Sequence, residues 1–211
     1  MRRVGVLLAG CGVYDGSDVQ ETVLLVLALR RRGLRVLPVA PEVEQKDVVD
    51  HTSGNVVEGA PARRVLEEAA RLTRGVAQPL AQVPAEELDA LAIPGGIGVV
   101  KNLCLPGPGL FGDGPLRPEI AAFLDKLRER KAPLAAIGLG DVVLARHQNR
   151  ALSQQVIGMP ASEISVDEET RTIFTPGFMG TSDLADVAAG VEKLVDALAR
   201  MVGMPKGLVI K

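Results

Sequence analysis

The sequence has few of the residues that metal clusters and disulfide frameworks require, with 2 cysteines and 2 histidines among 211 residues. Two cysteines do not make a disulfide framework, and neither Cys11 nor Cys104 stands in a zinc-ligand spacing. No cluster of histidine, cysteine and carboxylate residues predicts a metal site. The formal net charge of −2 gives no electrostatic reason to expect nucleic acid or an anionic membrane as a partner.

Long hydrophobic runs are also missing. The longest apolar stretches have the length of a strand or a short helix, so none is expected to span a bilayer. The first residues, Met1 to Arg3, lead directly into an apolar run and leave no room for a targeting peptide. We therefore expect a cytoplasmic protein. At 211 residues the chain is expected to form a single domain, residues 1–211, with a full core.

What the sequence does contain is an alternation of strand-like and helix-like segments. Short apolar runs predict buried strands, and apolar residues at helical spacing predict helices. The strands are expected at residues 4–9, 34–39, 90–93, 134–137, 162–166 and 171–174, and the helices at 18–32, 61–74, 118–130, 141–147 and from about 182. Residues 106–118 are rich in Gly and Pro and are expected to form a surface loop. This order predicts an α/β fold whose mostly parallel sheet is covered on both faces.

The stretch from Val4 to Glu21 combines a buried strand, a glycine-rich turn and the start of a helix. Ser17 or Asp18 can cap the helix, and Glu21 falls in its first turn, where a carboxylate is favoured. The turn lies at the carboxyl end of its strand, where open α/β sheets bind ligands. The helix face expected to pack on the sheet comprises Leu24, Leu27 and Ala28, with Val23 and Leu25 alongside.

Glycine-rich turns follow three of the predicted strands, at residues 10–16, 94–98 and 138–140. In a parallel sheet these turns lie at the same edge, so they can converge. Glycines there allow backbone N–H groups to approach a ligand, as in an oxyanion hole. Any one of the turns, taken alone, is better explained as a tight connection and nothing more. Three turns at one edge favour a binding site.

The third turn has the pattern of a nucleophile elbow. Residues Ala136 to Gly140 read small-x-nucleophile-x-Gly between a strand and a helix, and such an elbow needs small residues on both sides because the turn packs tightly. Gly138 occupies the nucleophile position, from which no side chain can attack. A plain strand-to-helix turn is the alternative interpretation of this segment.

Several motifs give the chain a resemblance to the ElbB-type, or ES-one-like, branch (enhancing lycopene biosynthesis proteins) of the PfpI/ThiJ and class I glutamine amidotransferase-like superfamily. The resemblance covers about the whole chain. It implies a flavodoxin-like three-layer sandwich, commonly a homodimer, a loose link to isoprenoid metabolism and, for some relatives, conversion of glyoxal-type dicarbonyls to hydroxy acids without a cofactor. The matching residues are Gly10-Cys11-Gly12-Val13-Tyr14-Asp15-Gly16-Ser17, Asp50-His51, Arg64-Val65-Leu66, Glu68-Ala69-Ala70-Arg71, Thr73-Arg74-Gly75, Pro94-Gly95-Gly96 with Gly98, Lys101-Asn102-Leu103 and Thr175-Pro176.

The family's functional residues match this chain unevenly. Glu21 matches the glutamate that in relatives hydrogen-bonds the nucleophilic cysteine, but that cysteine is replaced by Gly138 and the histidine that often follows it by Leu139. The stretch after Arg146 is also shorter than in relatives. The resemblance implies an oxyanion-hole side made by Gly95, Gly96 and the Leu139 amide, and it places further ligand contacts at Gly10, Cys11, Gly12, Asp15, Lys101 and Asn102.

Two functional hypotheses follow. The first is a family member without the cysteine chemistry that still binds a small carbonyl or carboxylate ligand, with Glu21 as the retained acid. The second is an active glyoxalase or hydrolase that uses Cys104, Cys11 or a water activated by Glu21. Glutamine amidotransfer is disfavoured because its cysteine and histidine are both absent. No cofactor is implied, His51 is expected to be a turn residue bonded to the backbone, and His147 is expected to end a helix.

Overall fold

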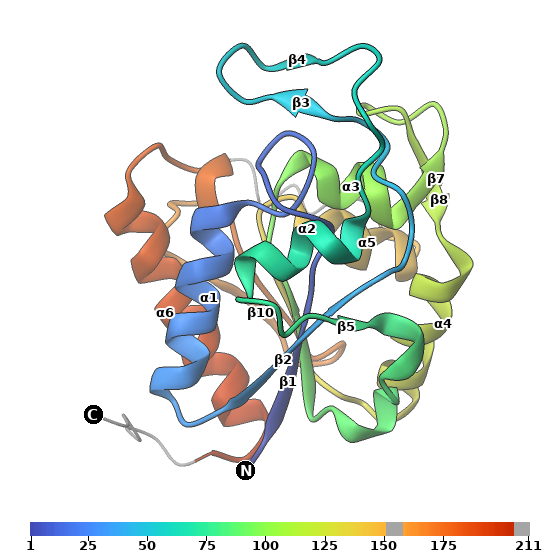
Figure 1. The fold of residues 1–211 in the computed structure, drawn as a ribbon. Helices are drawn as coiled ribbons and strands as arrows, with labels where there is room; N and C mark the ends of the chain where they lie inside the picture. Colours follow the sequence, from blue (N-terminus) through green and yellow to red (C-terminus); the bar gives the residue numbers. More distant parts are fainter. Residues whose placement is uncertain (151–157, 205–211) are drawn as a thin grey trace.

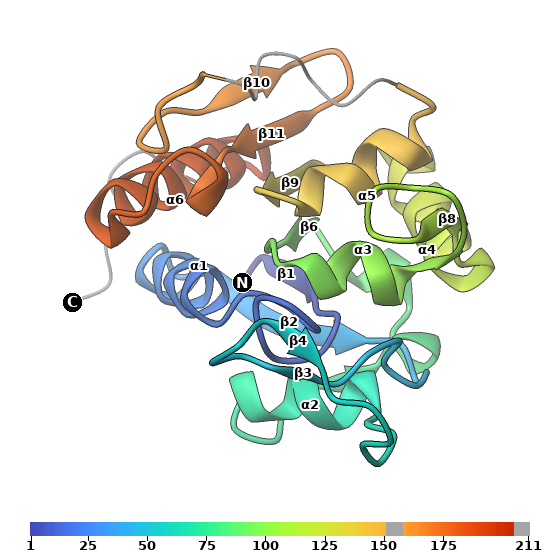
Figure 2. The same ribbon diagram turned by 90° about the horizontal axis from the view of Figure 1, so that it is seen from above.

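The computed structural model describes residues 1–150 and 158–204, and its centre is a seven-stranded sheet in the order β10-β11-β9-β6-β1-β2-β5 (Figures 1 and 2). Neighbouring strands are parallel throughout, except that β10 runs antiparallel to β11. The strands are β1 (Arg3–Leu7), β2 (Arg35–Ala40), β5 (Gln78–Pro79), β6 (Ala90–Ile93), β9 (Leu134–Ile137), β10 (Ser165–Asp167) and β11 (Thr172–Thr175).

Helices cover both faces of this sheet. The α-helices of the described residues are α1 (Val19–Arg31), α2 (Val65–Leu72), α3 (Ile97–Leu103), α4 (Pro118–Glu129), α5 (Gly140–His147) and α6 (Leu184–Met201). One hydrophobic cluster joins the sheet to α1, α2 and α6, and a second joins it to α3, α4 and α5. Figure 2 shows α1 and α6 side by side along one face. The predicted α/β, flavodoxin-like three-layer sandwich is therefore confirmed.

The central strands supply alternate residues to the two clusters, as the twofold period of a strand requires. In β6, for example, Ala92 packs toward α1 and α6, whereas its neighbours Leu91 and Ile93 pack toward α3 and α4. All four residues of β6 and of β9 are buried. Continuous burial is why the sequence shows these strands as unbroken apolar runs, and both were predicted with the correct boundaries.

Helix α1 differs from the prediction in the face that it buries. Thr22, Leu25, Ala28 and Leu29 are buried, whereas Val23 and Leu27 are 51% and 44% exposed. The helix begins at the predicted cap, because the Asp18 side chain accepts a hydrogen bond from the Glu21 N–H. The buried face of α1 is rotated relative to the predicted face because the first turn places the Glu21 and Thr22 side chains inward. Val23 and Leu27 were therefore wrongly assigned to the sheet-facing side.

Two small hairpins stand outside the central sheet. Strands β3 (Val49–Asp50) and β4 (Asn55–Val56) form one, above the turn after β1 at the top of Figure 1. Strands β7 (Cys104–Pro106) and β8 (Asp113–Leu116) form the other, within the segment predicted to be a plain loop. That prediction was wrong at its ends, because Gly and Pro mark the turn of a hairpin as readily as a loop. No helix in residues 1–150 and 158–204 is long and apolar enough to cross a membrane.

Candidate functional site

The backbone between β9 and α5 has the geometry of a nucleophile elbow. Gly138 has φ +51°, in the left-handed region, and its N–H donates to Thr175 O at 2.9 Å. Two residues later a Cβ on Gly140 would lie 2.3 Å from Ile93 O, so only glycine fits there. Tight packing therefore explains why the residue two positions after Gly138 is glycine, as the elbow pattern predicted. This segment is more than a generic strand-to-helix turn.

The position that a nucleophile would take lies beside Glu21. A Cβ on Gly138 would lie 3.4 Å from Glu21 Oε1 and 3.2 Å from Pro176 O. The first contact is an ordinary one, and the second needs the neighbour to move by a few tenths of an ångström. The elbow therefore keeps nearly enough room for a small side chain next to an acid. What it lacks is the side chain itself.

Glu21 is almost completely buried and is held by two backbone amides. Its Oε2 accepts from Gly95 N–H at 2.7 Å and its Oε1 accepts from Phe178 N–H at 3.0 Å. The fit is tight, because a Cβ on Gly177 would lie 2.2 Å from Oε1 and one on Gly95 would lie 2.6 Å from Oε2. Three segments far apart in the sequence thus meet on one carboxyl group.

Burial is the main cause that raises the pKa of Glu21 from 4.5 to about 7. The hydrogen bond from the Phe178 amide opposes this rise, the negative charge of Asp18 adds to it, and the hydrogen bond from the Gly95 amide also opposes it. Near pH 7 the group is therefore divided between its acid and its carboxylate forms. The acid form can donate a hydrogen bond to a ligand oxygen, and the carboxylate form can accept a proton. A carboxyl poised in this way at the carboxyl edge of an α/β sheet is a functional-site candidate.

The three glycine-rich turns converge as predicted. Ile97 N–H donates to Val13 O at 2.6 Å, and Asp18 N–H donates to Gly95 O at 2.8 Å, so the first two turns are bonded together. A Cβ on Gly95 would also lie 3.2 Å from Leu139 N, which brings the third turn alongside. The Gly95 N–H, however, donates its hydrogen bond to the Glu21 carboxyl group instead of pointing toward a ligand oxyanion. Gly95 is one of the residues predicted to form the oxyanion hole, and its N–H already has a hydrogen-bond partner inside the protein.

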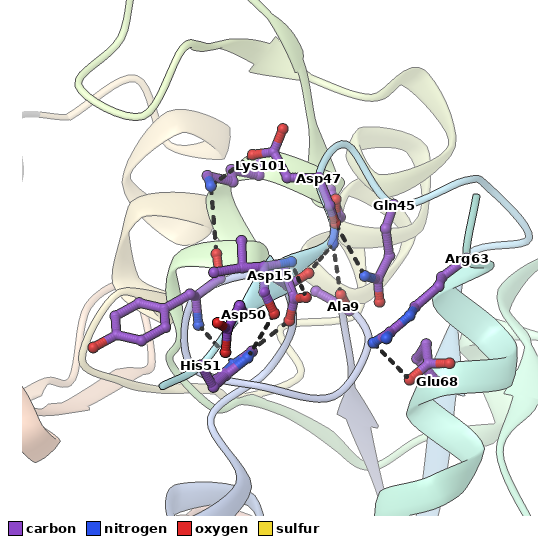
Figure 3. A network of polar contacts seen from close by, with 12 residues as sticks. Ala9, Asp15, Gln45, Asp47, Asp50, His51, Arg63, Glu68 and Lys101 are labelled. Carbon is purple, nitrogen blue, oxygen red and sulfur yellow. Dashed lines mark hydrogen bonds and ion pairs between the residues drawn. The ribbon is translucent and has the colours of Figure 1, made fainter. Parts of the chain in front are cut away.

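The loop from Gly10 to Ser17 is fixed by a second polar network, drawn in Figure 3. Buried Asn102 donates through Nδ2 to Ala9 O at 2.8 Å and to Asp15 O at 2.9 Å, and its Oδ1 accepts from Lys46 N–H at 2.9 Å. Lys101 pairs with Asp47 at 2.7 Å and reaches Tyr14 O at 3.4 Å. Asn102 and Lys101, predicted as ligand contacts, are thus used to join the loop to the segment that follows β2.

Asp15 and His51 tie the same loop to the β3–β4 hairpin. Asp15 Oδ2 accepts from Val49 N–H at 3.0 Å, and His51 Nδ1 lies 3.1 Å from Val49 O. His51 Nε2 accepts from Tyr14 N–H at 3.4 Å and lies 3.6 Å from Asp15 Oδ1. The prediction that His51 bonds to the backbone is confirmed. Gly10 and Gly12 allow this packing, since a Cβ on either would lie within 2.6 Å of a side-chain atom of Gln45 or His51.

Neither cysteine has the surroundings of an activated thiol. Cys104 is fully buried, its Sγ accepts from Arg146 Nη1 at 2.9 Å, and burial raises its pKa despite that arginine. Burial and the charge of Glu68 also raise the pKa of the Cys11 thiol. Since the thiolate is the nucleophile, both shifts act against reactivity at neutral pH. The burial of Cys104 in the core gives no support to the hypothesis that it acts as the nucleophile.

Other predicted features are placed as follows. His147 is the last residue of α5, and its Nε2 lies 2.7 Å from Asp125 Oδ1. Within residues 1–150 and 158–204, no group of three His, Cys, Asp or Glu residues is arranged to hold a metal ion. The site residues that the sequence reasoning missed are Gly177 and Phe178. A signal for them existed, because Pro176-Gly177-Phe178-Met179-Gly180 is a fourth glycine-rich segment after a strand of the same sheet.

Comparisons with known proteins agree on one family. No family model matches the chain. The rat ES1 protein homolog, mitochondrial (Rattus norvegicus), is 30% identical to it over 95% of this chain and 84% of the relative. The human glutamine amidotransferase-like class 1 domain-containing protein 3, mitochondrial (Homo sapiens), is 29% identical over the same shares of the two chains.

A solved structure extends this agreement to the whole fold. An isoprenoid biosynthesis protein with an amidotransferase-like domain from Ehrlichia chaffeensis superposes with a TM-score of 0.86 and 30% sequence identity. The match covers 96% of this chain and 100% of that one. The fold and the sequence therefore point to the same group of proteins.

Proposed function

The chain belongs to the ElbB/ES1-like family of glutamine amidotransferase-like proteins, and we propose that it binds a small carbonyl or carboxylate compound at the elbow without cysteine chemistry. Glu21 in its acid form would donate the hydrogen bond that recognises the ligand oxygen. The observation that carries the proposal is the pairing of an intact elbow backbone at Gly138 with a buried, poised acid at Glu21.

Two features support a binding role over a merely structural one. Burying a carboxyl group that has no cationic partner is costly, and carboxyl groups whose pKa is perturbed in this way are concentrated at functional sites. Here the two amides that hold Glu21 leave one lone pair on each carboxyl oxygen for a proton or a ligand. Gly138 also has the left-handed backbone at the central position of an elbow pattern between a strand and a helix.

The test is the pH dependence of ligand affinity. Pyruvate, which carries both a carbonyl and a carboxylate, is titrated by calorimetry between about pH 6 and pH 8.5. Because only protonated Glu21 can donate, we expect the affinity to fall by about tenfold per pH unit above pH 7. Glu21→Gln keeps a donor that does not titrate, so its affinity should not vary with pH.

The control for this experiment is Glu68→Gln. Glu68 is also a buried acid, paired with Arg71 at 2.9 Å, but it lies on α2. This variant should keep the pH dependence of the wild type. Absence of pyruvate binding at every pH, or an affinity that is the same at pH 6 and pH 8.5, would overturn the proposal.

A second candidate function is hydrolytic or glyoxalase turnover by a water that Glu21 activates. The pKa of Glu21 near 7 favours it, since a general base is most effective near the working pH. Replacing Cys104 and Cys11 by serine should leave such turnover unchanged, because neither thiol is activated. Loss of turnover in Glu21→Gln together with retained turnover in both serine variants would select this second function.

We also propose that the protein is a cytoplasmic homodimer. Val19, Val23 and Leu27 on α1 are 43%, 51% and 44% exposed and recur every fourth residue, so they share one helix face. A second copy of the chain is the occupant that the family resemblance favours for this face. Light scattering should show a dimer for the wild type and a monomer for Val23→Asp, and a wild-type monomer would contradict the proposal. Fractionation of the native cell tests the location.

A further inference from the structure

A pocket lies at the opposite edge of the sheet from the elbow, where four adjacent strands begin. Arg2 precedes β1, Asp89 precedes β6, Pro133 precedes β9 and Arg171 precedes β11. The pocket has a volume of about 330 Å³. We call it the basic pocket, and it is lined by Arg2, Leu88, Asp89, Arg130, Lys131, Ala132, Pro133, Arg171, Met201, Val202 and Gly203. Arg2, one of these lining residues, is next to the amino terminus, which Figure 1 marks at the bottom of the ribbon.

The lining carries a surplus of positive charge. Four of its side chains are cationic, and Asp89 is its single carboxylate. Asp89 is shared between the Arg2 guanidinium, at 2.7 Å, and the Arg3 N–H, at 2.7 Å. Among the described residues the lining therefore carries three more positive than negative charges. In a concave site such charges reinforce one another, and they attract a multiply charged anion more strongly than a single one.

Two of these cations occupy backbone positions that favour glycine. Lys131 has φ +53° and Arg171 has φ +52°, both in the left-handed region. The end of α4 shows what is unusual about Lys131. Its N–H bonds to Arg128 O and the following N–H bonds to Leu127 O, the same pair of bonds that ends α1 at Gly33 and α6 at Gly203. Helix ends of this kind usually place glycine at that residue, as α1 and α6 do.

Glycine would adopt this backbone at a lower cost than lysine does, and strained residues gather at functional sites. In residues 1–150 and 158–204, Lys131 makes no ion pair. Arg171 donates through Nη2 to Met201 O at 2.8 Å, but its Nε is buried and has no acceptor in the same part of the chain. Arg130 is anchored by bonds from Nη1 to Ala85 O and Leu88 O at 3.1 Å. Arg130 and Lys131, at the end of α4, and Arg171, before β11, thus bring cationic donor groups to the pocket from two segments.

We propose that the basic pocket binds the phosphate group of a small metabolite. Phosphate and diphosphate groups carry the multiple negative charge that this surplus of positive charge favours. Arginine forks and a lysine ammonium are also the side chains that most often hold phosphate oxygens. This site is separate from the elbow and involves neither Glu21 nor Gly138, so it does not depend on the function proposed for them.

The test is calorimetric titration of the full chain with three probes, namely inorganic phosphate, diphosphate and ADP. The buffer contains about 0.15 M NaCl, because salt of this strength screens loosely held surface charge beyond about 8 Å. The probe that binds most tightly tells whether the ligand is free phosphate, a diphosphate or a phosphate ester. We expect the tightest probe to have a submillimolar dissociation constant.

Lys131→Gly is the decisive variant. It removes one phosphate ligand and relieves the left-handed backbone, so its melting temperature should not fall while its affinity falls about tenfold. Arg74→Gly is the matched control. Arg74 is a second exposed cation in the left-handed region, with φ +57°, and it does not line the basic pocket. Its replacement should leave the affinity unchanged.

Three results would overturn the proposal. The first is the absence of binding by all three probes up to about 10 mM, which is weaker than the range of specific ligands. The second is an affinity that Lys131→Gly leaves unchanged. The third is an equal loss of affinity in Lys131→Gly and Arg74→Gly, which would show that the anion responds to net charge and not to this pocket.

Discussion

Glu21 makes the stability of the protein depend on pH in a direction that is unusual for a carboxyl group. Its pKa is about 7 in the folded protein against an ordinary value of 4.5. The folded state therefore binds the proton more tightly than the unfolded state does. The stabilising contribution of protonated Glu21 is fully present below pH 4.5 and is lost as the pH rises through 7.

The size of this effect follows from the two pKa values. Each pH unit between them corresponds to about 1.4 kcal/mol, so the loss reaches about 3 kcal/mol above pH 7. Glu21 is 3% exposed, so solvent screening does not reduce this figure much. Between about pH 5 and pH 8.5, where most buffers are usable, the expected loss is about 2–3 kcal/mol.

The assay is urea unfolding of the wild type and of Glu21→Gln at several pH values. Glutamine has one acceptor oxygen, so it can satisfy only one of the amides of Gly95 and Phe178, and the variant should be less stable by about 1–3 kcal/mol at low pH. That deficit should shrink or reverse as the pH rises from about 5 to 7, and it should stay level above about pH 8, where Glu21 is ionised in both the folded and the unfolded state. A difference in unfolding free energy that stays constant from pH 5 to pH 8.5 would refute the reasoning.

Two further predictions concern the residues that hold the site. Gly177→Ala would place a Cβ 2.2 Å from Glu21 Oε1 at a residue with φ +56°, so it should lower the free energy of unfolding by more than about 2 kcal/mol; unfolding at the wild-type urea concentration would contradict this. Asn102→Ala removes two buried hydrogen bonds and a partly buried one, and it should cost about 3 kcal/mol while speeding amide exchange at Lys46. Unchanged exchange there would show that Asn102 does not hold the loop.

The sequence predicted the parts of the site that follow from local pattern and sheet topology. Strands β6 and β9 are continuous buried runs, and Asp18 and Gly33 mark the ends of α1, so the position of Glu21 at the sheet edge could be derived. Parallel strands then required the three glycine turns to converge. Gly138 at the nucleophile position could be recognised from the small residues around it.

The remaining features depend on contacts between segments that are distant in the sequence. The periodicity of apolar residues in a single sequence does not reveal such contacts. Asn102 and Asp15 have protein partners because residues 45–51 cross over the loop from Gly10 to Ser17. No local pattern in residues 45–51 predicts that crossing. In the same way, the Gly95 amide bonds to Glu21 because α1 and the turn after β6 meet in space. The inward rotation of α1 at Thr22 has this cause as well.

The most direct test of the central claim measures hydroxy-acid formation from glyoxal and methylglyoxal by the wild type and by Gly138→Cys. The elbow geometry predicts an inert wild type and measurable turnover by Gly138→Cys, because the new Cβ would lie 3.4 Å from Glu21 Oε1. Unfolding measurements on both proteins confirm that the variant is folded. Turnover by the wild type at a rate that Gly138→Cys does not exceed would contradict the claim that the missing side chain at Gly138 determines what the site can do.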